Sequence, residues 1–222
     1  VSHMNRKQLR GISIMQRDLV GEEFRIIRTN LYFLQQQKEK QVILITSSIG
    51  AEGKSFASLN LAGVLAIPGK KVALLEFDMR KPTIIGTLSI EKTNGLNDKV
   101  NGDIKKISDI YHQYEEIPTL HIYPAGSSPK YSADLFLSEK IPELFNVLKS
   151  RYDYIIIDSA PIGLVSDALV LGSYADIVLF IIRQRNTLKK QLEFVKELAR
   201  SKKLSNLGFI FNDVKRGVKV GS

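Results

Sequence analysis

A short segment at positions 46–55, TSSIGAEGKS, has the residue types of a phosphate-binding loop. It follows the apolar run 41–46, which is typical of a buried strand, and opens an apolar stretch with helical character. Backbone N–H groups and a helix N-terminus at such a junction can cradle phosphate oxygens. Lys54 would then reach the β- and γ-phosphates of a nucleotide, and the Ser55 hydroxyl would ligate Mg²⁺. The segment departs from the full pattern G-x-x-x-x-G-K-[ST], because Ser48 occupies the first glycine position.

Acidic side chains end two further apolar runs. Glu76 and Asp78 stand two residues apart at the end of the run KVALLE, a spacing that puts both on one side of an extended chain. Carboxylates there can hold Mg²⁺ or accept a hydroxyl proton. Asp158 ends the run YIIID, as a Walker B aspartate does, and would complete the magnesium shell opposite Ser55. The predicted metal ligands are Ser55, Glu76, Asp78 and Asp158.

The elements that must position these residues alternate between strand and helix. Strands are expected at 41–46, 71–76, 120–124, 154–158, 176–183 and 207–212, and helices at 20–37, 53–67, 141–151, 163–174 and 187–203. Such β-branched runs between helices favour an α/β fold, with a mostly parallel central sheet covered by helices on both faces. Ligands of these sheets bind beyond the carboxyl ends of the strands, where the motifs above lie. The polar segment 94–118 shows little periodicity and is expected to be an irregular insertion at the sheet edge.

Length and composition limit the classes of protein to consider. The 222 residues suit one α/β domain, and no apolar run approaches the roughly 18 residues that a membrane span needs. Cysteine is absent, which excludes a disulfide framework and a thiolate metal site. Residues 1–3 are interpreted as a cloning scar before Met4, and residues 4–222 as a single domain. The net charge is +9, and the basic run 183–203 is interpreted as a solvated helix face, with no nucleic-acid partner expected.

Taken together, these motifs resemble those of the bacterial tyrosine kinases, the cytoplasmic domains of exopolysaccharide and capsule chain-length regulators. These kinases belong to the deviant-Walker P-loop class, which also holds the septum-site and partition ATPases. Residues 47–55 resemble their Walker A motif, 76–82 their Walker A′ motif (usually D-x-D-x-R-K-P) and 155–161 their Walker B motif. Segments 126–135 and 163–168 extend the similarity, which covers most of residues 21–212. The resemblance implies a P-loop NTPase-like fold.

The helix expected at 20–37 carries a further family motif. Glu22, Arg25 and Arg28 match the pattern E-x-x-R-x-x-R, and their spacing places them within one side of a helix. In the family this face docks onto the neighbouring subunit of a ring, so the helix is expected to mediate oligomerisation. An intrahelical Glu–Arg pair on a solvated surface is the alternative. The apolar side of the same helix is formed by Phe24, Ile27, Leu31 and Leu34.

The resemblance implies an ATP-dependent protein-tyrosine kinase that phosphorylates its own copies in trans. ATP or ADP with Mg²⁺ would bind the P-loop, and Asn212 lies where related ATPases read the adenine. Arg80 and Lys81 would be basic partners near the phosphates or the substrate. The expected nucleotide-binding residues are Gly50, Ala51, Glu52, Gly53, Lys54, Ser55, Phe56 and Asn212. The expected catalytic residues are Lys54, Glu76, Asp78 and Arg80.

This chain departs from the family pattern at three places. Glu76 replaces the usual first Asp of Walker A′, and its extra methylene adds ~1.5 Å of reach. The residues therefore leave open whether Glu76 or Asp78 is the base. Gly50 stands where the P-loop usually has Pro. No tyrosine follows Tyr174, although these kinases phosphorylate one another on a C-terminal tyrosine cluster.

Two alternative functions stay open at this point. A partition-type ATPase typically carries a signature lysine early in the P-loop, and positions 46–52 hold none. A nucleotide-binding regulatory module without turnover is kept open by Glu76. For the kinase, the resemblance implies a ring-like homo-oligomer, a separate or fused membrane activator and a phosphotyrosine phosphatase. It also implies a role in exopolysaccharide or capsule synthesis or export, in the cytoplasm at the inner face of the plasma membrane.

Overall fold

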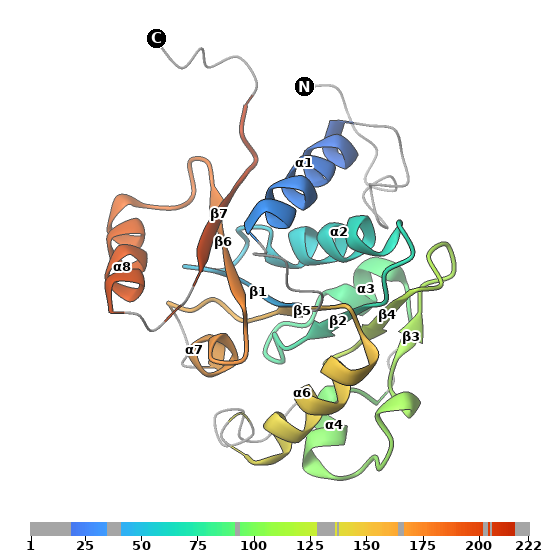
Figure 1. The fold of residues 1–222 in the computed structure, drawn as a ribbon. Helices are drawn as coiled ribbons and strands as arrows, with labels where there is room; N and C mark the ends of the chain where they lie inside the picture. The colour runs from blue at the N-terminus through green and yellow to red at the C-terminus, as the bar shows by residue number, and fades with distance from the viewer. Residues whose placement is uncertain are drawn as a thin grey trace.

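A computed structural model describes residues 19–34, 41–91, 94–127, 136, 138–163, 167–201, 204 and 206–215. Within these residues one sheet of seven strands has the order β3-β4-β2-β5-β1-β6-β7 (Figure 1). The strands are β1 (Gln41–Ser47), β2 (Val72–Glu76), β3 (His112–Gln113), β4 (Leu120–Tyr123), β5 (Tyr154–Asp158), β6 (Ile177–Arg183) and β7 (Leu207–Asn212). All neighbouring pairs are parallel except β3–β4, which confirms the predicted mostly parallel sheet.

Helices cover both faces of this sheet, as predicted. They are α1 (Leu19–Leu34), α2 (Lys54–Ala66), α3 (Ile84–Leu88), α4 (Leu96–Asn101), α6 (Lys140–Arg151), α7 (Asp167–Gly172) and α8 (Lys189–Arg200), with the 3₁₀ turn η2 (Ile107–Asp109). Helices α1, α2 and α3 pack with one face of the sheet, and α4, α6, α7 and α8 pack with the other. In Figure 1, α1 and α2 lie above the sheet and α4 and α6 below it.

Alternation along the strands divides the core into two clusters. Val42 and Leu44 of β1 belong to the cluster between the sheet and helices α6 and α7. Ile43 and Ile45 belong to the cluster between the sheet and α2. Successive strand side chains point to opposite faces, and both faces are covered, so every residue of β1 is buried. This explains why β1 appears in the sequence as an uninterrupted apolar run.

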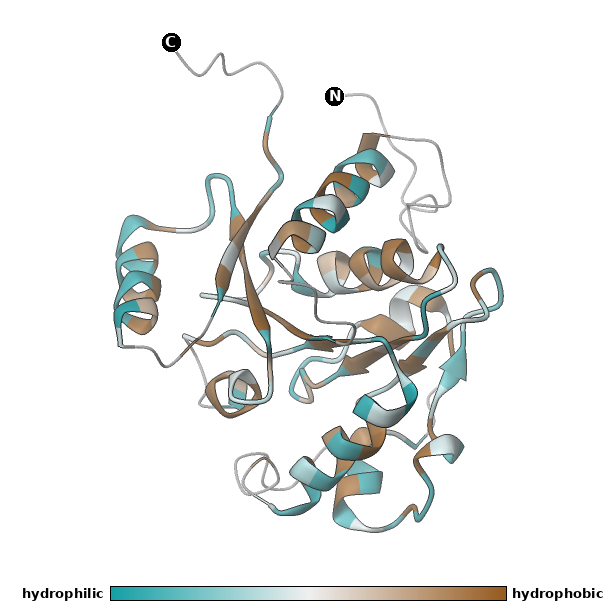
Figure 2. Ribbon diagram, in the orientation of Figure 1, coloured by the Kyte–Doolittle hydropathy of each residue, from teal (hydrophilic) through white to brown (hydrophobic). Residues whose placement is uncertain are grey.

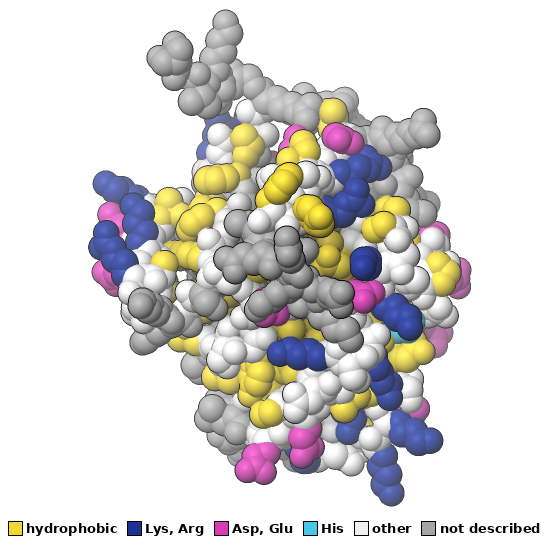
Figure 3. All heavy atoms as spheres, viewed as in Figure 1, with side chains coloured by type: hydrophobic (Ala, Val, Ile, Leu, Met, Phe, Trp, Pro, Cys, Tyr) yellow, Lys and Arg dark blue, Asp and Glu magenta, His cyan; other side chains and the backbone are white. Residues whose placement is uncertain are grey.

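The hydropathy of the helices reflects how many neighbours each has. Helix α2 is apolar almost all round (Figure 2), because it lies between α1 and strands β1, β2 and β5. Helix α8 has one apolar side, where Val195 and Leu198 are buried, and a polar outer side. Lys and Arg side chains line that outer side (Figure 3), and Lys189, Lys190 and Lys196 are exposed. Within the described residues, the part of the basic run that lies in α8 is thus on the exposed side of the helix.

The segment 94–118 is more regular than the sequence predicts. It contains α4, η2 and β3, and Leu96, Val100 and Ile107 are buried in the core cluster on the same side of the sheet as α6. Helix α4 spans only six residues, which is too short to produce a recognisable period, and it is followed by Gly102, whose φ of 98° terminates it. The prediction of an irregular segment was wrong, whereas its position at the sheet edge, through the antiparallel pairing of β3 with β4, is confirmed.

Other boundaries differ by a few residues or fall outside the described part of the chain. The helices predicted at 20–37, 163–174 and 187–203 correspond to α1, α7 and α8. Residues 35–37, 164–166 and 202–203 are not among the described residues, and neither are 1–18, which include the supposed cloning scar. Among the residues that are described, no helix combines the length and the apolar character needed to cross a membrane.

Candidate functional site

The three sequence motifs converge on one cavity at the carboxyl ends of the strands. The P-loop joins β1 to α2, and β1 pairs with β5 on one side and with β6 on the other. A cavity of about 590 Å³ opens beside it, a size suited to a small-molecule ligand. Its lining comes from all three motifs and comprises Gly50, Ala51, Gly53, Lys54, Ser55, Phe56, Asp78, Arg80, Lys81, Thr83, Ala160 and Pro161.

The backbone of the P-loop requires glycine immediately before α2. Gly53 has φ 96°, and a Cβ atom there would lie 2.2 Å from the Asn212 side-chain nitrogen. The Asn212 amide donates to the Glu52 carbonyl oxygen at 2.9 Å. The predicted contact of Asn212 with adenine stays a prediction, but its side chain is in direct contact with the P-loop.

Asp158 has the properties of a metal ligand. Its carboxylate is fully buried, and Oδ1 accepts a hydrogen bond from the Ser58 hydroxyl at 3.1 Å. Within the described residues, Oδ2 has no hydrogen-bond partner. Burial raises the pKa of Asp158 to about 7, and the nearby Ser55 hydroxyl and the Lys54 ammonium act in the opposite direction. An unpartnered buried carboxylate oxygen near a serine hydroxyl fits Mg²⁺, which prefers oxygen ligands.

Glu76 holds backbone in place. Its Oε1 atom accepts hydrogen bonds from the N–H groups of Thr83 at 2.6 Å and Ile84 at 2.7 Å, at the start of α3. Its Oε2 atom accepts one from Ala125 at 3.4 Å. Burial raises the pKa of Glu76, and these three N–H groups oppose the shift. Both carboxylate oxygens are therefore engaged, although Glu76 lies directly opposite Asp158 in the β2–β5 pairing.

Asp78 differs from Glu76 because it lines the cavity. One of its oxygens accepts a hydrogen bond from the Lys81 N–H group at 3.2 Å, which closes the turn after β2. Arg80 and Lys81 line the same cavity. Of the two acidic residues that the sequence left open as base, only Asp78 has access to a ligand in this cavity.

A further acidic residue near this site was not singled out from the sequence. Asp167, the first residue of α7, is buried, and burial raises the pKa of its carboxyl group. The charge of Arg80 lowers that pKa and the charge of Asp78 raises it, so the three side chains share one electrostatic environment. Asp167 does not end a strand, so strand-end position did not identify it. It lies within segment 163–168, which resembles the bacterial tyrosine kinases, and this resemblance could have identified it.

The motif on α1 makes contacts within the chain. Arg25 forms an ion pair with Glu22 at 3.0 Å, which is the intrahelical pairing considered as the alternative. Arg28 donates a hydrogen bond to the carbonyl oxygen of Val64 in α2 at 3.1 Å. The residue four positions after Val64 is Pro68, which has no N–H group to offer. Arg28 thus satisfies an orphan carbonyl of α2, and the role of the motif in oligomerisation stays a prediction.

These contacts predict different effects for the two arginines. Arg28→Met should lower the free energy of unfolding by about 1–2 kcal/mol, because the Val64 carbonyl loses its partner. Arg25→Met should lower it by less than Arg28→Met does, because the ion pair of Arg25 with Glu22 is exposed to solvent. Urea unfolding measures the free energy of unfolding of both variants. The protein concentration is one at which size-exclusion chromatography shows the same oligomeric state for both. Equal losses would contradict a special role of Arg28 in holding α1 on α2.

Comparisons with known proteins identify relatives of the chain. The AAA domain family matches residues 40–206. The tyrosine-protein kinase YwqD of Bacillus subtilis is 36% identical over 90% of this chain and 83% of the relative. The putative tyrosine-protein kinase EpsB of Ralstonia nicotianae is 33% identical over 86% of this chain, which spans only 25% of that protein. The crystal structure of the chimeric protein CapA2B2 superposes with a TM-score of 0.86 at 27% identity, covering 92% of this chain and 90% of that one.

Proposed function

This chain belongs to the AAA domain family and, within it, to the bacterial tyrosine kinases, and we propose that it transfers the γ-phosphate of ATP to tyrosines of a neighbouring copy. Nucleotide binding follows from the P-loop family itself. The observation that carries the proposal is the convergence of Lys54, Asp78 and Arg80 on one cavity beside the buried Asp158 carboxylate. A cation for the phosphates and a carboxylate for the tyrosine hydroxyl are the groups that phosphoryl transfer needs.

Each residue has a distinct part in the proposed reaction. The P-loop N–H groups and Lys54 hold the phosphates, and Arg80 and Lys81 balance the charge of the transferred group. The tyrosine oxygen attacks the γ-phosphorus, the bond to the β–γ bridging oxygen breaks, and ADP leaves. The proton of the tyrosine hydroxyl passes to the Asp78 carboxylate. Positioning of the two substrates supplies most of the rate increase.

Ser55 and Asp158 are the residues that would hold Mg²⁺ in this site. When bound, the metal neutralises charge on the β- and γ-phosphates. Glu76 and Asp78 are predicted metal ligands as well. Because both Glu76 oxygens accept backbone N–H groups, we assign Glu76 to holding the loop after β2 and the start of α3. Asp78 lines the cavity, and its one hydrogen bond among those described engages Oδ1, which supports its role as the base.

The proposal extends to assembly and location. Family membership supports a ring-like homo-oligomer in which α1 contacts a neighbour, and α1 exposes the apolar side chains of Ile26, Tyr32 and Phe33. It also supports a membrane activator, either separate or fused, and a phosphotyrosine phosphatase that resets the kinase. We propose that the domain acts in the cytoplasm at the inner face of the plasma membrane, in exopolysaccharide or capsule synthesis or export.

One assay distinguishes the proposed function from its alternatives. The purified chain is incubated with Mg·ATP and a tyrosine-containing acceptor peptide, and phosphotyrosine and released phosphate are both quantified. We expect phosphotyrosine that disappears when excess EDTA removes the metal. Released phosphate without phosphotyrosine would favour a partition-type ATPase. Tight nucleotide binding with neither product would favour a regulatory module without turnover.

A further inference from the structure

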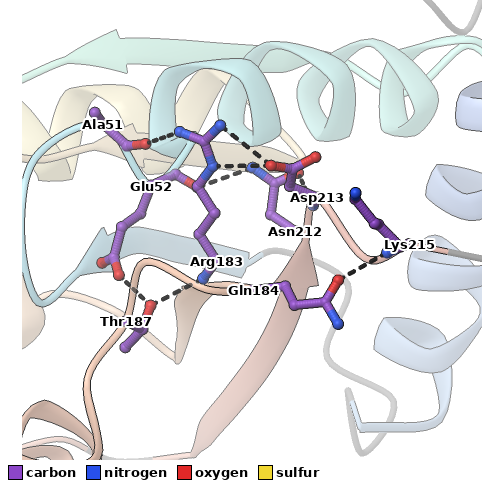
Figure 4. A network of polar contacts seen from close by, with 8 residues as sticks. All are labelled: Ala51, Glu52, Arg183, Gln184, Thr187, Asn212, Asp213 and Lys215. Atoms are coloured by element: carbon purple, nitrogen blue, oxygen red, sulfur yellow. Dashed lines mark hydrogen bonds and ion pairs between the residues drawn. The ribbon is translucent and has the colours of Figure 1, made fainter. Parts of the chain in front are cut away.

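The Glu52 side chain is buried inside the P-loop and does not line the cavity. Its Oε2 atom accepts hydrogen bonds from the N–H groups of Ser48 at 3.0 Å and Ile49 at 3.2 Å, and from the Ser48 hydroxyl at 3.2 Å. Its Oε1 atom accepts a hydrogen bond from the Thr187 hydroxyl, in the turn between β6 and α8. The Glu52 carboxylate is thus hydrogen-bonded both to the backbone of its own loop and to Thr187, which follows β6 (Figure 4).

The Thr187 hydroxyl acts as acceptor in one hydrogen bond and as donor in the other. Its hydroxyl oxygen accepts the backbone N–H of Arg183 at 2.9 Å. The single hydroxyl proton is therefore available to Glu52, which as a carboxylate has only acceptor atoms. A hydrogen bond from a hydroxyl to a carboxylate is among the stronger ones in proteins.

Arg183 and Asn212 fix the adjoining backbone of the loop. The Arg183 guanidinium donates to the Ala51 carbonyl oxygen at 2.8 Å and to the Asp213 carboxylate at 3.2 Å. Ala51 has φ 61°, a left-handed conformation that a residue other than glycine adopts only when its surroundings hold it. Asn212 donates to the Glu52 carbonyl oxygen at 2.9 Å (Figure 4). Residues 51–53, of which Ala51 and Gly53 line the cavity, are therefore held in place by residues at the carboxyl ends of β6 and β7.

We propose that Thr187 and Arg183 are positioning residues for the nucleotide, which act through Glu52 and Ala51 to keep the P-loop in its phosphate-binding shape. The inference rests on the proposed function only in taking a nucleotide as the ligand. Neither residue lines the cavity, so each acts through the loop. A loop that is ordered before binding loses less conformational entropy when the phosphates arrive, which increases affinity.

Matched variants test this inference by isothermal titration with ADP, together with thermal unfolding of the free protein. Thr187→Val keeps the shape of the side chain and removes the hydroxyl, and should raise the Kd for ADP about tenfold. Thr187→Ser keeps the hydroxyl and should stay within about threefold of the unsubstituted chain. Arg183→Lys keeps the charge but lacks the planar guanidinium, which donates to the Ala51 carbonyl and the Asp213 carboxylate at the same time. It should raise the Kd for ADP about three- to tenfold.

The control is Thr119→Val. Thr119 is also half-buried and donates its hydroxyl to a backbone carbonyl, that of Ala66 at 3.2 Å, but it lies before β4, at the opposite ends of the strands. It should leave the Kd for ADP unchanged. The inference is overturned if Thr187→Val lowers the unfolding temperature as Thr119→Val does and leaves the Kd unchanged, or if Thr187→Ser loses as much affinity as Thr187→Val. Failure of the unsubstituted chain to bind ADP would overturn the proposed function as well, and that result is visible without any variant.

Discussion

Lys54→Met is expected to lower the rate of phosphate transfer by at least about 1,000-fold, because a cation that stabilises the charge of the transferred group is lost. Lys54 is the first residue of α2, is nearly fully buried and lines the cavity. Its charge also favours the ionised form of Asp158, so its removal raises the pKa of that carboxyl further and weakens a predicted metal ligand. Methionine has a similar length and an apolar stem, so the fold should persist. Single-turnover transfer of the γ-phosphate measures the effect.

The matched control for this prediction is Lys196→Met. Lys196 lies on the exposed side of α8, so the same change of side chain occurs in solvent. Its transfer rate should equal that of the unsubstituted chain. Comparable rates for the two variants would remove Lys54 from the proposed mechanism, provided that circular dichroism shows both to be folded.

The second large effect is expected for Asp78→Asn, with a fall in kcat of about 10²- to 10⁴-fold, the usual contribution of a general base. Asparagine can still accept the Lys81 N–H bond, so the turn after β2 should keep its shape. The Kd for ADP should then change by less than about threefold. Steady-state kinetics and ADP titration on the same preparation separate the catalytic effect from the binding effect.

Glu76→Gln is the comparison that decides between the two acidic residues. An amide nitrogen cannot accept a hydrogen bond, so at least one backbone N–H near Glu76 loses its partner. We expect a loss of about 1–2 kcal/mol in the free energy of unfolding. We also expect a smaller fall in kcat than for Asp78→Asn. The reverse order, with Glu76→Gln inactive and Asp78→Asn active, would assign the base to Glu76.

The sequence by itself determined the architecture and the position of the site. The strands at 154–158 and 207–212 were predicted with the bounds that the structure has. The first appears as a continuous apolar run because β5 is buried on both faces of the sheet. The second is an apolar run as well, although Phe209 and Phe211 of β7 are exposed. The P-loop could be predicted because a Gly-Lys-Ser sequence between a strand and a helix is a local pattern that indicates phosphate binding. Helix α4 was missed since its six residues span less than two turns.

Only the tertiary structure decided what the individual side chains in the site contact. Glu76 and Asp78 are both strand-end carboxylates in the sequence. In the structure, the Glu76 carboxylate accepts hydrogen bonds from the backbone N–H groups of residues 83, 84 and 125, whereas Asp78 lines the cavity. Glu52 is predicted to bind the nucleotide, and this stays a prediction, while its side chain contacts Thr187, 135 positions away. Arg28 likewise meets a carbonyl 36 positions away. Periodicity and motif spacing report only neighbours along the chain, whereas these partners are brought together by strand order and helix packing.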